Sequence, residues 1–157
     1  MKKINKIAFA FLVTILSTMT YGQDKQKYNI DNSNIALQGY SAVSYLDLGL
    51  AQKGSQQYKS EYDKVIYYFT SEEQKQAFEK NPEKYLPQYG GYCAFGTYAG
   101  AKFRVDPNKF LVKEGKYFLF LNNLELDAQQ LWLAEKDHKR LVKKADENWN
   151  KLSTTYN

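Results

Sequence analysis

Two segments of the chain place alternating apolar and polar residues on either side of a two-residue turn, and this pattern limits the fold more than any other feature. Residues 57–70 alternate around Asp63-Lys64, and residues 109–120 flank Glu114-Gly115. Period-two alternation is typical of half-buried strands, and a two-residue connection joins antiparallel neighbours. The sequence therefore predicts two β-hairpins.

The period changes directly after the first hairpin. Ser71 is followed three residues later by Gln74, the spacing of a capping box at the start of a helix. We expect a short helix that buries Ala77 and Phe78. Asn81-Pro82 should end it, because the residue before a proline avoids the helical region.

The last quarter of the chain has helical periodicity. Asp127 is a suitable N-cap, and apolar residues then recur at spacings near three and four. They are Leu131, Ala134, Leu141, Ala145, Trp149 and Leu152. Near the start, residues 37–45 are expected to form a turn that enters a short apolar strand. With no evident internal repeat or linker, the pattern indicates one α+β domain: a small antiparallel sheet of hairpins, a short helix and a long C-terminal amphipathic helix.

The first residues have the three parts of a secretory signal peptide. A basic start precedes an apolar run from Ile7 to Leu16, which is too short to span a bilayer, and small residues follow up to Gly22. A retained anchor helix is the alternative. We expect cleavage near Gly22, export to the periplasm or beyond, and no membrane span afterwards. The predicted organisation is a signal peptide (1–22), a polar lead-in (23–34) and a domain (35–153).

Charge and cysteine content exclude several classes of function. Cleavage removes Lys2, Lys3 and Lys6 from 22 basic residues and leaves all 17 acidic ones, so the net charge falls to about +2. Such a charge gives no footprint for nucleic acid. One cysteine cannot form an internal disulfide, and one cysteine with one histidine cannot complete a closed four-ligand zinc site.

The single cysteine lies in an unusual stretch, PQYGGYCAFG, residues 87–96. Cys93 has two interpretations. It is either a small buried hydrophobe packed among aromatic rings, or a reactive thiol or soft-metal ligand. Glycines such as Gly90 and Gly91 would let the backbone approach a ligand or turn N–H groups toward a thiolate.

The neighbours of Cys93 leave the same choice open. His138 is either a partly buried histidine with one hydrogen bond, or a base or ligand beside Cys93. Four tyrosines form either core and sheet surface or a pocket for a small planar ligand. They are Tyr85, Tyr89, Tyr92 and Tyr98. No Ser-His-Asp order, paired carboxylates or phosphate-cradling glycine loop indicates an enzyme.

Several ordered segments resemble one family. YYFTSEEQKQAFEKNPEKY, residues 67–85, resembles the core of the YHS domain. GYSAVSY (39–45), PQYGGYCAFG (87–96) and ADENW (145–149) are similar to elements of the exported branch of that family. The resemblance covers about residues 35–152. Some relatives in this branch are described as selenoproteins, with selenocysteine at the position matching Cys93.

The resemblance implies binding chemistry without its usual ligands. The metal-associated branch, which is linked to copper-transporting pumps, carries three cysteine metal ligands, and the matching positions here are Ser44, Thr70 and Gln74. Copper stays possible as a cofactor, but the thiolate site does not carry over. We expect an exported binding module for a metal ion or small ligand, with Cys93 at or near the site and Gly90, Gly91, Tyr92 and Tyr89 lining it. A thiol redox protein acting through Cys93, or a purely structural or interaction domain, are the alternatives.

Overall fold

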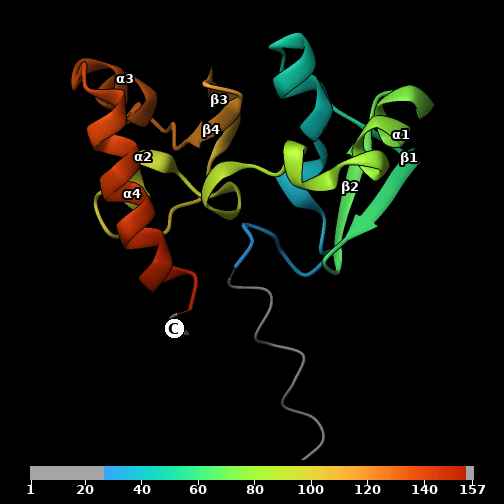
Figure 1. The fold of residues 1–157 in the computed structure, drawn as a ribbon, viewed down its shortest axis with the longest axis horizontal. Coiled ribbons are helices and arrows are strands. Elements are labelled where there is room, and N and C mark those ends of the chain that lie inside the picture. Colours follow the sequence, from blue (N-terminus) through green and yellow to red (C-terminus); the bar gives the residue numbers. More distant parts are fainter. Residues whose placement is uncertain (1–26, 155–157) are drawn as a thin grey trace, which may run out of the picture.

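The computed structural model describes residues 27–154, so the predicted signal peptide and its cleavage point near Gly22 lie outside the described residues. In chain order the elements are η2 (Ala36–Gly39), η3 (Ser44–Leu48), β1 (Ser55–Tyr62), β2 (Val65–Phe69), α1 (Glu72–Lys80), η4 (Pro82–Tyr85), η5 (Gln88–Gly91), α2 (Ala94–Tyr98), β3 (Asp106–Lys113), β4 (Lys116–Phe120), α3 (Ala128–Ala134) and α4 (His138–Leu152). Figure 1 shows two lobes, with β1, β2 and α1 in one and β3, β4 and α2 to α4 in the other.

The α+β class and both hairpins are confirmed. Asp63 and Lys64 have φ of 52° and 62°, and Glu114 and Gly115 have φ of 53° and 71°. Positive φ at both central residues is the turn geometry whose twist matches that of the flanking strands. The hairpins do not join into one small sheet: β1–β2 and β3–β4 are separate two-stranded antiparallel sheets.

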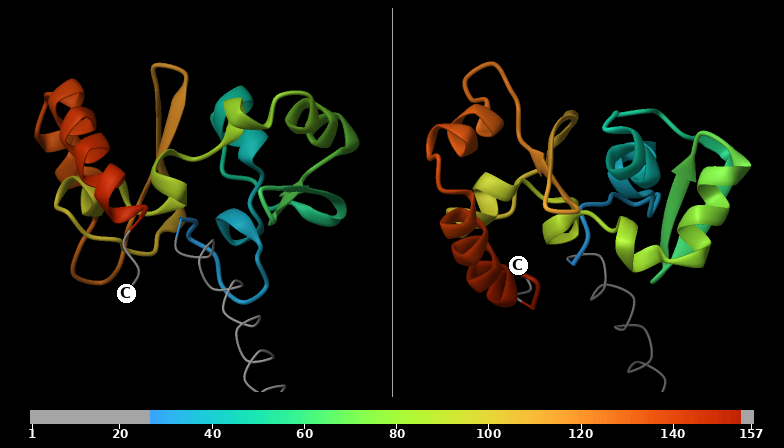
Figure 2. Two further views of the ribbon diagram at one scale, coloured as in Figure 1. Left: turned by 60° about the horizontal axis from the view of Figure 1, so that its bottom comes forward. Right: turned by 45° about the horizontal axis from the view of Figure 1, so that its top comes forward.

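The two lobes contain the same succession of elements. Each opens with three consecutive residues of positive φ, at Leu37–Gly39 (55°, 53° and 82°) and at Tyr89–Gly91 (56°, 60° and 83°). A short helical segment, a hairpin and a capped helix follow in both lobes. Figure 2 shows the two hairpins lying in different lobes, each with its own helices. The chain is therefore a structural tandem repeat, and the expectation that it has none is wrong.

The strand register strengthens this conclusion. In the first hairpin the pair Ser55–Phe69 is followed, after an irregularity, by Lys59–Tyr68. In the second, Asp106–Phe120 is followed by Phe110–Leu119. Corresponding residues lie 51 positions apart throughout both hairpins. A bulge bends a strand and leaves residues unpaired, so its recurrence at one position reflects a common backbone plan.

Both repeats contribute to one core. Tyr45 of the first repeat stacks on Tyr117 of the second, with 4.9 Å between ring centroids. It meets Phe110 edge-on at 5.0 Å, and its hydroxyl donates a 2.8 Å hydrogen bond to the carbonyl of Pro107. Tyr45 and Tyr117 are fully buried. The two repeats therefore share buried contacts across their junction.

Two expected elements differ from the structure. Residues 37–45 form the turn η2 and the start of a helical segment instead of a strand. The long C-terminal helix is divided into α3 and α4, because Lys136 has a φ of 57° and the Asp137 side chain accepts a 3.0 Å hydrogen bond from the Arg140 N–H. A second N-cap therefore competes with continuation of the first helix.

The described part of the polar lead-in packs against the domain. Residues 27–34, called here the N-terminal strap, contain Tyr28, which is 6% exposed. The Asn29 backbone N–H donates to the Gly90 carbonyl at 2.8 Å, and its side-chain amide donates to the Gly91 carbonyl at 2.9 Å. The strap is thus held by the glycine loop of the second repeat. No helix within residues 27–154 is long and apolar enough to cross a membrane.

Candidate functional site

Cys93 is buried and acts as a helix cap. Its side chain and backbone together are 1% exposed, and its Sγ accepts a 3.4 Å hydrogen bond from the Gly96 N–H in the first turn of α2. Its own N–H donates to the Phe103 carbonyl at 3.0 Å. A thiolate reacts only where reagents can reach it, so this burial favours the packing interpretation.

The first repeat has a hydroxyl in the same role. Ser41 is also fully buried, and its Oγ accepts from the Ser44 N–H at 3.4 Å. The Ser41 N–H donates to the Gln52 carbonyl at 2.8 Å, as Cys93 does to Phe103. Cys93 therefore occupies the same cap position that Ser41 occupies in the first repeat.

Folded protein is expected to resist alkylation of Cys93 by iodoacetamide at neutral pH, because the sulfur is shielded. The same thiol should react fully after unfolding in guanidinium chloride. Mass spectrometry of the two samples measures the difference. Rapid labelling of the native protein would contradict the packing role.

Cys93→Ala should lower the unfolding free energy by about 1 kcal/mol through loss of the cap contact.

The residues expected to line a site around Cys93 have structural partners. Tyr89 donates its hydroxyl to the Asp146 carboxylate at 3.1 Å, and burial raises its pKa, with the nearby Asp146 charge adding to the effect. A Cβ on Gly90 would lie 1.9 Å from the carbonyl oxygen of Lys27. Gly91 receives the Asn29 amide, and the Tyr92 hydroxyl donates to the Tyr28 carbonyl at 3.2 Å. Residues 89–92 thus hold the N-terminal strap by hydrogen bonds and close packing.

His138 begins α4 and contacts aromatic rings. Its Nδ1 accepts a 3.2 Å hydrogen bond from the Trp132 indole, and the Phe118 ring meets it edge-on at 5.2 Å. Burial lowers the pKa of His138, and the Lys113 charge adds to this shift. Among the described residues, none of its hydrogen bonds or ring contacts leads to Cys93. The structure does not bring the two together as a catalytic or metal-binding pair.

The three positions that the resemblance matches to cysteines do come together. The Gln74 amide donates to the Ser44 hydroxyl at 3.0 Å, and the Thr70 N–H donates to Gln74 Oε1 at 3.2 Å. Ser41 and Gln52 complete this polar cluster through bonds of 2.7 and 2.8 Å. Cu(I) selects thiolate and thioether sulfur, so these hydroxyl and amide groups do not fit it. Within residues 27–154 no group of three or more His, Cys, Asp or Glu side chains could hold a metal.

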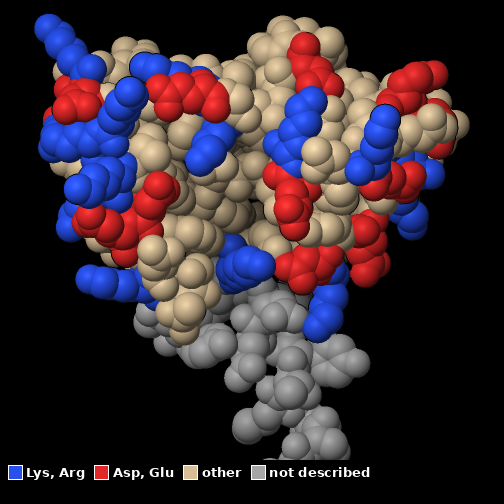
Figure 3. Space-filling model, in the orientation of Figure 1, with Lys and Arg blue, Asp and Glu red and all other residues tan. Residues whose placement is uncertain are grey.

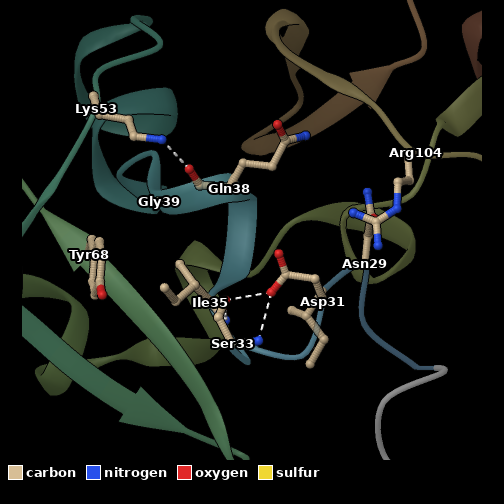
Figure 4. Close-up of a pocket in the computed structure, with 10 residues that line it drawn as sticks. Asn29, Asp31, Ser33, Ile35, Gln38, Gly39, Lys53, Tyr68 and Arg104 are labelled. Carbon is tan, nitrogen blue, oxygen red and sulfur yellow. Dashed lines mark hydrogen bonds between the residues drawn. The ribbon is translucent and has the colours of Figure 1, made fainter.

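A pocket of about 370 Å³ lies where the strap meets both repeats. Figure 4 shows its polar side chains arriving from separate segments of the chain. They include Asn29 and Asp31 of the strap, Gln38 of η2, Lys53, Tyr68 of β2 and Arg104. We call this space the junction pocket. Its volume falls in the range of small-molecule sites.

The repeat supplies two cations to the junction pocket. Lys53 precedes β1 and Arg104 precedes β3, and the two residues are separated by the same 51 positions as the hairpins. Lys53 is held by the Gln38 carbonyl and lies 5.0 Å from the centre of the Tyr40 ring. Arg104 makes no hydrogen bond or ion pair with the described residues. Its guanidinium donors are therefore available to a ligand.

A smaller pocket beside the glycine loop is less suited to binding a charged ligand. It has a volume of about 260 Å³ and is lined by Tyr89, Gly90, Trp149 and others. Its charged groups already have partners: Lys27 pairs with Asp63 at 3.2 Å, and Asp146 accepts from Tyr89. The junction pocket is thus the better candidate site.

Sequence reasoning did not identify Asp31, Lys53 or Arg104. The available signal was the pair GYSA (39–42) and GYCA (91–94), which marks the same point in both repeats. This pair is offset by 52 positions, whereas the two hairpin turns, Asp63-Lys64 and Glu114-Gly115, are offset by 51. The turns, rather than this pair, align Lys53 with Arg104 as the cations that precede the hairpins. Figure 3 shows acidic and basic side chains interspersed over both lobes on the face drawn, so charge alone does not reveal the site.

No protein-family model matches this chain, and no curated protein or solved structure matches it either.

Proposed function

We propose that this chain is an exported YHS-like binding module that takes a small charged organic molecule in the junction pocket. The observation that carries the proposal is the Arg104 guanidinium, which lines a pocket between the repeats and is unpaired among residues 27–154. A planar fork of five donors is suited to a carboxylate or phosphate group. Cys93 has a structural role in this proposal.

The cluster at Ser44, Thr70 and Gln74 supports the family part of the proposal. Thr70 and Gln74 lie 26 and 30 residues after Ser44, yet side-chain and backbone groups at these positions bond to each other. The resemblance places three metal ligands at these positions, and proximity is what such a site requires. Their replacement by a closed polar cluster favours a different ligand and a different place for it.

The redox alternative is less favoured. It needs a thiol that meets an oxidant or a partner disulfide, and attack requires access to the sulfur. The 1% exposure of Cys93 and its bond to Gly96 leave no such access. Metal binding by the Cys93 sulfur is disfavoured for the same reason, because the sulfur is buried.

Thermal unfolding with added small molecules tests the proposal. The probes are acetate, inorganic phosphate, glycine and leucine. Cu(I) is added separately to test the metal-binding alternative. A probe present at about ten times its dissociation constant adds about 1.4 kcal/mol. We expect at least one organic or phosphate probe to raise Tm by about 4 °C. This rise should persist in Cys93→Ala and disappear in Arg104→Gln.

Arg140→Gln is the matched control, because the Arg140 guanidinium is exposed outside the pocket and pairs with Glu135. It should keep the full rise in Tm. Equal stabilisation of wild type and Arg104→Gln would contradict the proposal. A rise in Tm that depends on Cu(I) and on Cys93 would contradict it in favour of the metal function.

A further inference from the structure

We infer that the ligand of the junction pocket is a small zwitterion of the α-amino acid type, with its carboxylate on Arg104 and its ammonium group on Asp31. The inference rests on the proposed function and adds the ligand class. It comes from two opposite charges that line one pocket without pairing with each other.

Only one of the two carboxylate oxygens of Asp31 accepts hydrogen bonds from the described residues. Its Oδ1 accepts hydrogen bonds from the Ser33 hydroxyl and from the Ser33 N–H, the latter at 2.8 Å. Its Oδ2 accepts none from the described residues. The bonds from Ser33, with the charge of Arg104 as a smaller cause, lower the pKa of Asp31, so the group is a carboxylate at neutral pH. An exposed carboxylate oxygen without a partner among the described residues is an acceptor for an ammonium group.

Arg104 and Asp31 are close enough to interact through space, yet they form no ion pair within 4.0 Å. Figure 4 shows the Arg104 side chain near Asn29 and the Asp31 carboxylate turned toward Ser33. A molecule that carries both charges can satisfy both groups at once. A simple anion would pair with Arg104 but would also face the carboxylate of Asp31, and like charges brought together reduce affinity.

The rest of the pocket suits an uncharged side chain. Ile30, Ile35 and Tyr68 line it beside the polar groups. Apolar lining with a few well-placed polar groups is the usual composition of a small-molecule site. Lys53 is committed to the Gln38 carbonyl and the Tyr40 ring, so it adds positive potential without being the main anchor. An aliphatic amino acid such as leucine matches this lining.

Three probes that differ by one charged group test the inference. They are leucine, 4-methylpentanoate (which lacks the ammonium group) and 3-methylbutylamine (which lacks the carboxylate). Isothermal titration of the full chain should give leucine at least a tenfold affinity advantage over either analogue, because each analogue leaves one pocket charge unpaired. Asp31→Asn should remove the preference for leucine over 4-methylpentanoate. Arg104→Gln should weaken leucine at least tenfold, while Arg140→Gln should not.

The outcomes separate this inference from the proposed function. If 4-methylpentanoate binds wild type as tightly as leucine, and Arg104→Gln weakens it, the zwitterion assignment is overturned and the pocket remains a binding site. If leucine does not bind, the inference is also overturned. If in addition no probe of the thermal panel raises Tm in an Arg104-dependent way, the proposed function fails with it.

Discussion

Gly90→Ala is expected to detach the N-terminal strap and destabilise the protein by about 3 kcal/mol. A Cβ at this position would lie 1.9 Å from the Lys27 carbonyl oxygen and 3.1 Å from its carbon, so the strap backbone would have to move. The φ of 60° adds strain for any side chain. Urea unfolding measures the loss. Amide exchange of Asn29 should quicken, because its N–H bonds to the Gly90 carbonyl.

Gly49→Ala is the matched control. Gly49 has a φ of 65°, but an added Cβ would meet nothing within 4 Å. Only the conformational cost of about 1 kcal/mol should appear. Equal losses in the two variants would show that the close approach of the strap to Gly90 does not contribute to stability.

Tyr45→Ala is expected to destabilise the protein by about 4 kcal/mol, because it removes a fully buried ring that joins the two repeats. The ring stacks on Tyr117 and contacts Phe110, both in the second repeat. Tyr45→Phe keeps these contacts and loses only the bond to the Pro107 carbonyl. It should cost about 1–2 kcal/mol.

Tryptophan fluorescence reports whether Tyr45→Ala destabilises the second repeat together with the first. Trp132 and Trp149 both belong to the second repeat, in α3 and α4. Tyr45→Ala should lower the midpoint measured by tryptophan emission as much as the midpoint measured by far-ultraviolet circular dichroism. A tryptophan midpoint that stays at the wild-type value would show that the repeats unfold separately, against a common core.

Features that depend on neighbouring residues could be predicted from the sequence. The turn at Asp63-Lys64 and the cap at Ser71 are confirmed, because turn and capping preferences act over a few residues. Phe78 is fully buried, as expected, whereas Ala77 is only partly buried. The break between α3 and α4 was missed because helical spacing continues across Asp137, whose capping bond ends the run.

The repeat was missed because the two halves share backbone conformation more than residues. Leu37 and Gln38 adopt the positive φ that Tyr89 and Gly90 adopt in the other half, although three of the four are not glycine. Leucine is unusual there, since its Cβ disfavours the left-handed region. In the sequence the correspondence is visible in GYSA and GYCA and in the two alternating segments around the hairpin turns.

The site could not be predicted because its residues come from separate segments. Asp31, Lys53 and Arg104 are distant in the chain and meet only after the strap has packed on both repeats. In the sequence each is an ordinary surface charge. The glycine-rich and aromatic surroundings of Cys93 left a packing role and a reactive thiol both open. In the structure Gly90 and Gly91 accept hydrogen bonds from the strap, and Cys93 is 1% exposed.

The most direct test of the account uses the side-chain Nε–Hε signals of the arginines in a ¹⁵N-labelled sample, since the chain contains Arg104 and Arg140 alone. Arg140→Gln assigns the pair. Titration with leucine is predicted to shift the Arg104 signal and leave the Arg140 signal and the backbone amide of Cys93 unchanged. Shifts at Cys93 and Gly96 with a static Arg104 signal would contradict a binding site at the junction of the repeats.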